Sequence, residues 1–113
     1  MKLFRVLLVI LSVNILIYTL YTGTSHGWNL LSIFVKDISE FTWPGQFNTD
    51  FTSFLLLSGL WTMWRQKFSA ASVVLGLVAF VGGIIFLAPY LLYLSFKNDG
   101  DIGAVLLGKH FKS

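Results

Sequence analysis

The sequence predicts an all-α polytopic membrane protein with three transmembrane helices and a short amphipathic helix in the membrane interface between the first two. Of its 113 residues 56% are hydrophobic and only 12% are charged, whereas a soluble domain has about a quarter charged residues. Two stretches, 6–35 and 68–96, contain no charged residue, and each exceeds the roughly 20 apolar residues that one crossing needs. This composition excludes a water-soluble enzyme and a nucleic-acid-binding domain, and it predicts a single membrane domain over 1–113.

The first span is expected over 3–21, behind Lys2 and Arg5. A positive start followed by an apolar run also describes a secretory signal peptide, and the small residues 22–25 resemble a cleavage region. The apolar run is long for a signal peptide, which favours a retained anchor. Cleavage of this segment stays the alternative.

The loop 22–43 is too short and too charged to cross a membrane. Within it Leu30, Phe34 and Phe41 follow the spacing of one helix face. An amphipathic helix that lies in the interface between Trp28 and Trp43 is therefore expected here.

The second span is expected over 44–64. Only 14 uncharged residues separate Asp50 from Arg65, which gives about 21 Å of helix, short of a hydrocarbon core of roughly 30 Å. A start at Pro44, a residue favoured in the first turn, supplies the missing length and places Asp50 inside the helix. Alternatively Asp50 is a helix N-cap, which the run Asn48-Thr49-Asp50 also suits.

The third span is expected over 69–96, after a short basic turn that makes an antiparallel hairpin with the second. Pro89 predicts a bend there and not a break, because membrane helices tolerate Pro. The tail 97–113 is too short to cross again and is expected to lie on the membrane surface.

Charge predicts the orientation of these spans. Four basic residues lie in short segments beside span ends that contain no acid: Lys2, Arg5, Arg65 and Lys67. The other four lie in longer segments that also contain all five acids: Lys36, Lys97, Lys109 and Lys112. Basic residues in short loops face the cytoplasm. The N-terminus is thus expected inside and the C-terminus outside.

Three polar residues are candidates for a functional site. Asp50 within a span indicates a proton or cation site or a contact with a partner subunit, since such residues face a bundle interior or water. Asn14 and Tyr18 share one face of the first span with Tyr21. This face is expected to point at the other helices, because polar groups in lipid need partners.

A stripe of small residues predicts close helix packing, because such residues let helix backbones approach. On the third span the stripe consists of Ser72, Gly76, Ala79 and Gly83. Gly59 is its counterpart on the second span. The stripe either packs the hairpin against itself or forms a seam for another subunit.

Chemistry-bearing groups are scarce. Cysteine is absent, which excludes thiolate metal sites and Cys nucleophiles. His26 and His110 are the only histidines and neither lies in a span, so haem ligation is disfavoured. We expect no catalytic residue, no metal and no cofactor.

Part of the chain resembles short bacterial inner-membrane proteins of unknown function with about three spans. The resemblance rests on an Asp at a span entrance and on brief motifs: Gly59-Leu60-Trp61, Trp64-Arg65, Gly82-Gly83 and Ala88-Pro89-Tyr90. It implies a bacterial inner membrane and no activity.

The expected function is therefore that of a non-catalytic accessory or assembly subunit of a membrane complex, or of a small homo-oligomer. Its expected partners are the lipid bilayer and other membrane subunits or itself, not nucleic acid. The alternative is an oligomeric proton- or cation-coupled transporter that uses Asp50.

Overall fold

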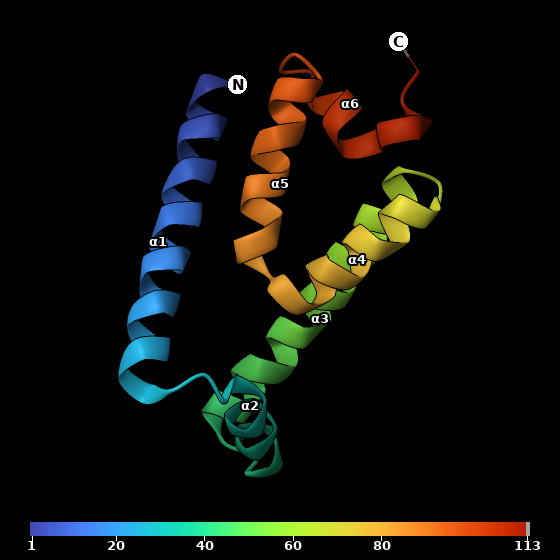
Figure 1. Cartoon of the computed structure of the whole chain (residues 1–113). Helices are drawn as coiled ribbons and strands as arrows, with labels where there is room; N and C mark the ends of the chain where they lie inside the picture. Colours follow the sequence, from blue (N-terminus) through green and yellow to red (C-terminus); the bar gives the residue numbers. More distant parts are fainter. Residues whose placement is uncertain (113) are drawn as a thin grey trace.

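The computed structural model describes residues 1–112, and all its regular secondary structure in that range is helical, as predicted, with no strand. Figure 1 shows the six helices and a final 3₁₀ turn, η1. Their bounds are α1 Lys2–His26, α2 Leu30–Ser39, α3 Trp43–Arg65, α4 Ala70–Gly82, α5 Ile84–Lys97, α6 Ile102–Leu107 and η1 Gly108–His110.

Helix α1 is the one described helix that is long and apolar enough to cross a membrane. Its 25 residues correspond to about 37 Å. A signal sequence near an N-terminus passes the same test. The finding therefore supports a membrane protein, whereas the prediction of three spans goes beyond it.

Helix α3 begins close to the predicted position. Trp43 is its first residue, Pro44 lies in the first turn, and Thr42 occupies the N-cap position. Asp50 is consequently inside the helix, so the alternative in which it caps the helix is wrong. Near the start of α3 the backbone of α2 passes so close that a Cβ on Gly45 would overlap the Asp37 carbonyl oxygen.

The predicted third span, 69–96, is not one helix. It divides into α4 and α5, and the break lies at Gly83, not at a bend near Pro89. Gly83 has a φ of +59°, a conformation that glycine adopts without the steric cost of a side chain. A Cβ there would also lie 2.9 Å from the Phe51 ring. Pro89 is accommodated within α5.

The break reverses the chain. Helix α4 runs back along α3, and α5 then turns to run beside α1 (Figure 1). At 13 and 14 residues, the two helices measure about 20 and 21 Å. Both chain ends therefore lie at one end of the molecule, which differs from the predicted arrangement with the C-terminus opposite the N-terminus.

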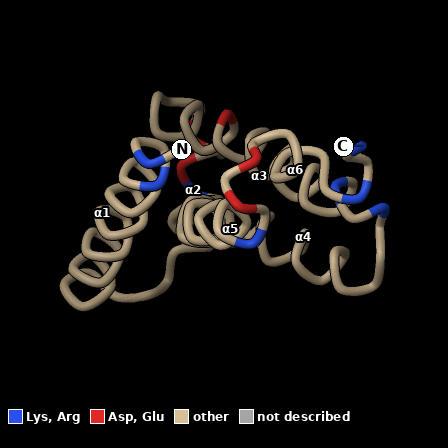
Figure 2. The backbone as a smooth tube through the Cα atoms, turned by 90° about the horizontal axis from the view of Figure 1, so that it is seen from above, with Lys and Arg blue, Asp and Glu red and all other residues tan. Residues whose placement is uncertain are grey.

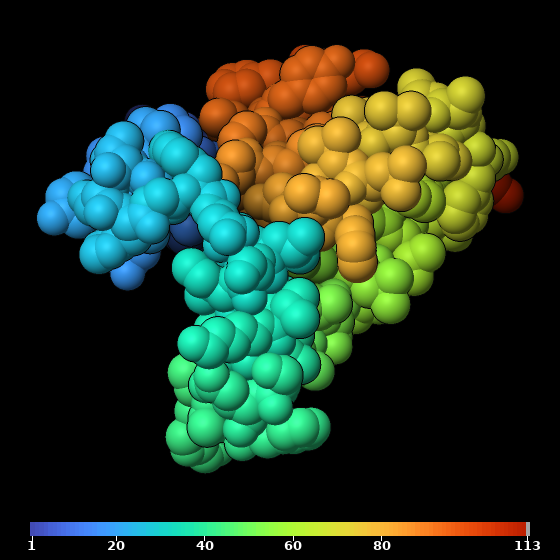
Figure 3. Space-filling view, turned by 60° about the horizontal axis from the view of Figure 1, so that its bottom comes forward, coloured from blue at the N-terminus to red at the C-terminus, as the bar shows by residue number. Residues whose placement is uncertain are grey.

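The interior of the fold is small. The largest fully buried side chains are Val105, Thr62, Ser72 and Ser95, and Ala79 and Ala88 are also inaccessible. Helix α1 packs mainly on α5, and α2 with the start of α3 projects as an arm from the rest (Figure 3). The molecule extends 49 × 27 × 23 Å.

Candidate functional site

Seven of the eight Lys and Arg residues lie at the end of the molecule that carries both termini, which we call the basic end. They sit at the start of α1, at the ends of α3 and α5 and after α6, as Figure 2 shows from above: Lys2, Arg5, Arg65, Lys67, Lys97, Lys109 and Lys112. Asp99 and Asp101 also lie there, between α5 and α6. The opposite end, which we call the acidic end, holds Lys36 with Asp37, Glu40 and Asp50 on α2, its C-cap and the first half of α3.

Arg65 is buried at the basic end, with 3% of its surface exposed. Its Nε donates to the Val105 carbonyl at 2.6 Å and its Nη2 donates to the Ala104 carbonyl at 3.2 Å. These oxygens belong to α6, and the Ala104 carbonyl also accepts from the amide of Gly108, which follows the helix. The guanidinium therefore ties α6 to the end of α3 through neutral oxygen atoms.

Two aromatic side chains of α3 complete this attachment. Trp61 Nε1 donates to the Leu106 carbonyl at 2.9 Å. The His110 ring stacks on Trp64 with centroids 4.1 Å apart, and its Nε2 lies 2.8 Å from the Trp64 carbonyl oxygen. Because a carbonyl only accepts, Nε2 carries the proton in this contact. Gly108 is required here, since a Cβ would overlap the Arg65 carbonyl.

Arg5 joins α1 to the end of α5. Its Nε donates to Ser95 Oγ at 3.0 Å and its Nη2 donates to the Ser95 carbonyl at 2.9 Å. The guanidinium also lies 4.0 Å above the centroid of the Phe96 ring. In the sequence Arg5 and Arg65 signal orientation alone, and no local pattern indicates their partners 90 and 40 residues away.

A small cavity opens between the ends of α3 and α5 and η1. Its volume is about 220 Å³. Its walls come from three basic residues and four neighbours: Arg65, Lys97, Lys109, Gln66, Leu94, Asn98 and Gly108. Of the described residues that line it, none is acidic.

Asp50 lies at the acidic end on an exposed part of α3. It lines an open groove of about 550 Å³ between α2 and α3, together with Gln46, Thr49 and Ser53. The hydroxyls of Thr49 and Ser53 donate back to carbonyls of their own helix. The groove is therefore partly polar but not enclosed.

Asn14 and Tyr18 do not point at the other helices, contrary to expectation. Asn14 is exposed, and Tyr18 and Tyr21 are 69% and 70% exposed. The half-buried and buried side of α1 is a different one and follows helical spacing: Arg5, Leu8, Ser12, Ile15 and Thr19. The hydrogen bonds of Arg5 to Ser95 turn this side of α1 toward α5. On the same side the Ser12 hydroxyl donates to the Leu8 carbonyl within α1.

Four of the five residues in the predicted small-residue stripe lie where α3 meets α4: Ser72, Gly76, Ala79 and Gly59 are buried there. A Cβ on Gly59 would lie 2.9 Å from the Gly76 carbonyl oxygen, and the reverse distance is the same. The two backbones are in direct contact, so the stripe packs the hairpin against itself. Gly83 instead forms the break between α4 and α5.

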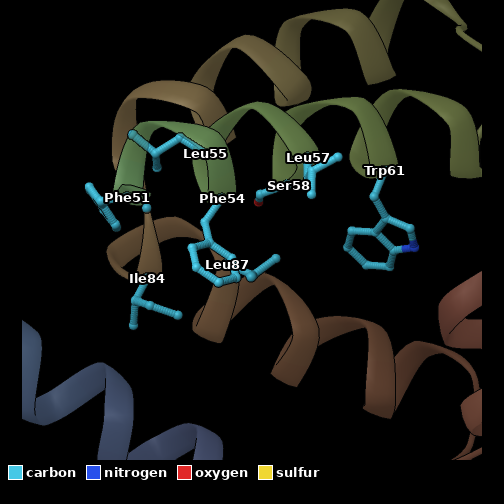
Figure 4. A pocket seen from close by; sticks show the side chains of 9 residues that line it. Phe51, Phe54, Leu55, Leu57, Ser58, Trp61, Ile84 and Leu87 are labelled. Atoms are coloured by element: carbon cyan, nitrogen blue, oxygen red, sulfur yellow. The ribbon is translucent and has the colours of Figure 1, made fainter. Parts of the chain in front are cut away.

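A second, apolar cavity lies where α5 leaves α3 and α4 (Figure 4). Its volume is about 500 Å³, and Phe54, Ile84 and Leu87 line it. Ser58 also faces it, and the Ser58 hydroxyl oxygen is the one buried side-chain polar atom without a partner within residues 1–112.

The two histidines are far apart. His26 ends α1, whereas His110 ends η1 at the basic end (Figure 1). No group of three or more His, Asp or Glu residues within 1–112 is arranged to hold a metal ion.

Comparison with known proteins adds no assignment. No family model, no curated protein and no solved structure matches this chain.

Proposed function

We propose that this chain is a small non-catalytic integral membrane protein that acts as an accessory or assembly subunit of a membrane complex, or as a small homo-oligomer. The observation that carries the proposal is the break at Gly83, which lies about half-way along α1 and not at either end of the molecule (Figure 1).

In a bilayer that α1 spans, this break lies at membrane depth. Helix ends leave backbone amides and carbonyls without helical partners. Such groups are tolerated in the hydrocarbon region only where protein or a water-filled cavity covers them. Gly83 itself is buried, its amide donates to the Ala79 carbonyl and its carbonyl accepts from the Phe86 and Leu87 amides. The first residues of α5, Ile84 and Ile85, are 37% and 43% exposed. A further protein surface over this start of α5 would cover the amides there.

The exposed polar face of α1 supports the same proposal. The Asn14 carboxamide lies in the middle of the one described helix that is long and apolar enough to cross a membrane, and it has no hydrogen-bond partner within residues 1–112. A side-chain amide in lipid gains from a partner on a neighbouring helix. Tyr18 and Tyr21 extend this face by two turns, which gives a second chain a continuous surface to bind.

The proposed membrane is the bacterial inner membrane, with the basic end in the cytoplasm. This orientation follows the positive-inside rule and puts α2 and the acidic end outside. Both chain termini then lie on the cytoplasmic side. The hydrogen bonds of Arg5 to Ser95 support a retained α1, since removal of α1 would strip α5 of its neighbour.

The mass of the purified protein in mild detergent tests the proposal. We expect a dimer, a larger oligomer or a complex with co-purifying subunits. The Asn14→Leu variant should shift the population toward the monomer, and Leu16→Val, on a different exposed part of α1, should not. A wild-type protein that is monomeric and alone at every concentration would contradict the proposal.

One observation favours the alternative function of a proton- or cation-coupled carrier built from several copies. Asp50, Gln46, Thr49 and Ser53 all carry side-chain oxygen atoms and line one groove. Uptake by reconstituted protein that Asp50→Asn abolishes would favour the carrier, and uptake that is absent or unchanged in this variant would remove its basis.

A further inference from the structure

We infer that the cavity between the ends of α3 and α5 and η1 binds a phosphate group, carried either by an anionic lipid headgroup or by free phosphate. Three cationic side chains, Arg65, Lys97 and Lys109, line this space of about 220 Å³ together with the amide side chains of Gln66 and Asn98. The inference concerns a ligand of the basic end and goes beyond the proposed association with other subunits.

Arg65 supplies the fixed part of the site. Its bonds to Val105 and Ala104 hold the guanidinium in place and leave part of its donor fork unused. Nη1 has no hydrogen bond within residues 1–112 and is not among the buried polar atoms that lack a partner, so it is not sealed in the interior. Arg65 is one of the residues that line the cavity, and we assign its free Nη1 donors to this space. A planar guanidinium matches the geometry of phosphate oxygens.

The two lysines supply the exposed charge of the cavity, and Lys97 Nζ lies 5.8 Å from the centroid of the Tyr93 ring. Lys97 and Lys109 are exposed and come from different elements, the end of α5 and η1. Asn98 adds an amide whose Nδ2 donates to the Leu94 carbonyl at 2.8 Å, which fixes its orientation. Three like charges around one small space repel each other. An anion in the cavity relieves this repulsion.

Nearby carboxylates do not fill this role. Asp101 is committed to the start of α6, where its Oδ1 accepts from the Ala104 amide at 3.3 Å. Asp99 is exposed and does not line the cavity. The positive charge of the cavity is thus left for an external anion.

The position of the cavity fits a lipid headgroup. Trp61 and Trp64 surround the same end of α3, and tryptophans gather where a membrane meets water. Basic pockets between helices on the cytoplasmic side bind anionic headgroups. The inference that the phosphate belongs to a lipid rests on the proposed insertion of the chain in a membrane. The inference that the cavity binds a phosphate group does not.

Native mass spectrometry of the full chain in mild detergent tests the site, with titrations of phosphatidylglycerol, phosphatidylcholine and inorganic phosphate. The test variant is Lys97→Gln with Lys109→Gln. The matched control is Lys67→Gln with Lys112→Gln, which removes the same charge from the same end but lies outside the cavity lining. Each lysine lost from the cavity should weaken binding about fivefold, and the pair about 30-fold.

Tighter binding of phosphatidylglycerol than of phosphatidylcholine, reduced in the cavity variant and much less in the control, supports a lipid headgroup. Saturable binding of inorganic phosphate with the same variant pattern, without a preference between the lipids, supports a soluble phosphate. An equal loss in both variants, or no binding of either anion, overturns the inference. These outcomes do not depend on the oligomeric mass, so a failure of this site and a failure of the proposed function remain distinguishable.

Discussion

The basic end and the acidic end of the molecule are built differently. At the basic end, side chains bond to backbone carbonyls far along the chain, from Arg5 to Ser95 and from Arg65 to Val105. At the acidic end, within residues 1–112, the one such bond between elements runs from Asn48 Nδ2 to the Phe34 carbonyl at 3.3 Å, over 14 residues. The arginines thus assemble the helices of one end, while the acidic end is a local pairing of α2 with α3.

This difference assigns the basic residues two tasks. Buried or half-buried arginines bind neutral carbonyls near helix ends, and they hold α1 and α6 in place. Within residues 1–112 the exposed lysines form no hydrogen bond to a carbonyl, and Lys97 Nζ lies 5.8 Å from the centroid of the Tyr93 ring. Substitutions at the two kinds of residue should therefore differ in effect.

The largest effect is expected from Arg65→Met. It removes two hydrogen bonds from a charged donor; the Val105 carbonyl loses its bond from Arg65, while the Ala104 carbonyl keeps its bond from the Gly108 amide. The free energy of unfolding in mixed micelles should fall by about 3 kcal/mol. Protease cleavage after α6 should speed up, while Lys67→Met should change stability by less than about 0.5 kcal/mol. Equal effects of both variants would refute the structural role of Arg65.

A smaller loss is expected at the α3–α4 contact. The Cβ of Gly76→Ala would lie 2.9 Å from the Gly59 carbonyl oxygen, and backbone there has little room to shift. Overpacking of this kind costs about 2 kcal/mol. Chemical unfolding in micelles measures it, with the exposed Val81→Ala on the same helix as the control. A neutral Gly76→Ala would mean that the hairpin is looser than described.

Arg5→Gln should cost less, about 1 kcal/mol, because Arg5 is only half-buried and water replaces part of what it loses. Hydrogen exchange should increase in the first turns of α1 and at the end of α5, and not in α3 or α4. Lys2→Gln serves as the control. Exchange that rises uniformly along the chain would argue against a specific attachment of α1 to α5.

The smallest effect on stability is expected from Asp50→Asn. The Asp50 carboxylate is exposed and has no hydrogen-bond partner within residues 1–112, so thermal unfolding should shift by less than about 0.5 kcal/mol in free energy. A larger loss would reveal a contact that this account of the acidic end lacks.

Local signals predicted some elements well. The run between Asp50 and Arg65 is too short to cross a bilayer, and this length argument together with Pro44 placed the start of α3 within one residue. The spacing of small residues predicted the α3–α4 contact, because steps of three and four keep them on one helix face.

Other features depend on contacts that no local signal carries. A continuous apolar run has the same composition whether it forms one membrane crossing or two half-length helices. Gly82-Gly83 lies within such a run, and it therefore did not predict that the chain reverses there. The orientation of α1 depends on Arg5 reaching Ser95, 90 residues away. The sequence places four basic residues on each side of the membrane if 69–96 is one crossing, whereas the fold brings seven of the eight to one end.

The reversal at Gly83 is the central claim, and cysteine labelling in intact cells tests it most directly. The chain has no cysteine, so Lys36→Cys, Lys67→Cys and Lys112→Cys each introduce a single thiol. With a membrane-impermeant maleimide, Lys36→Cys should react in intact cells, and the other two should react only after lysis. Labelling of Lys112→Cys in intact cells, with Lys67→Cys protected, would show that the chain between them crosses the membrane once and would contradict the reversal.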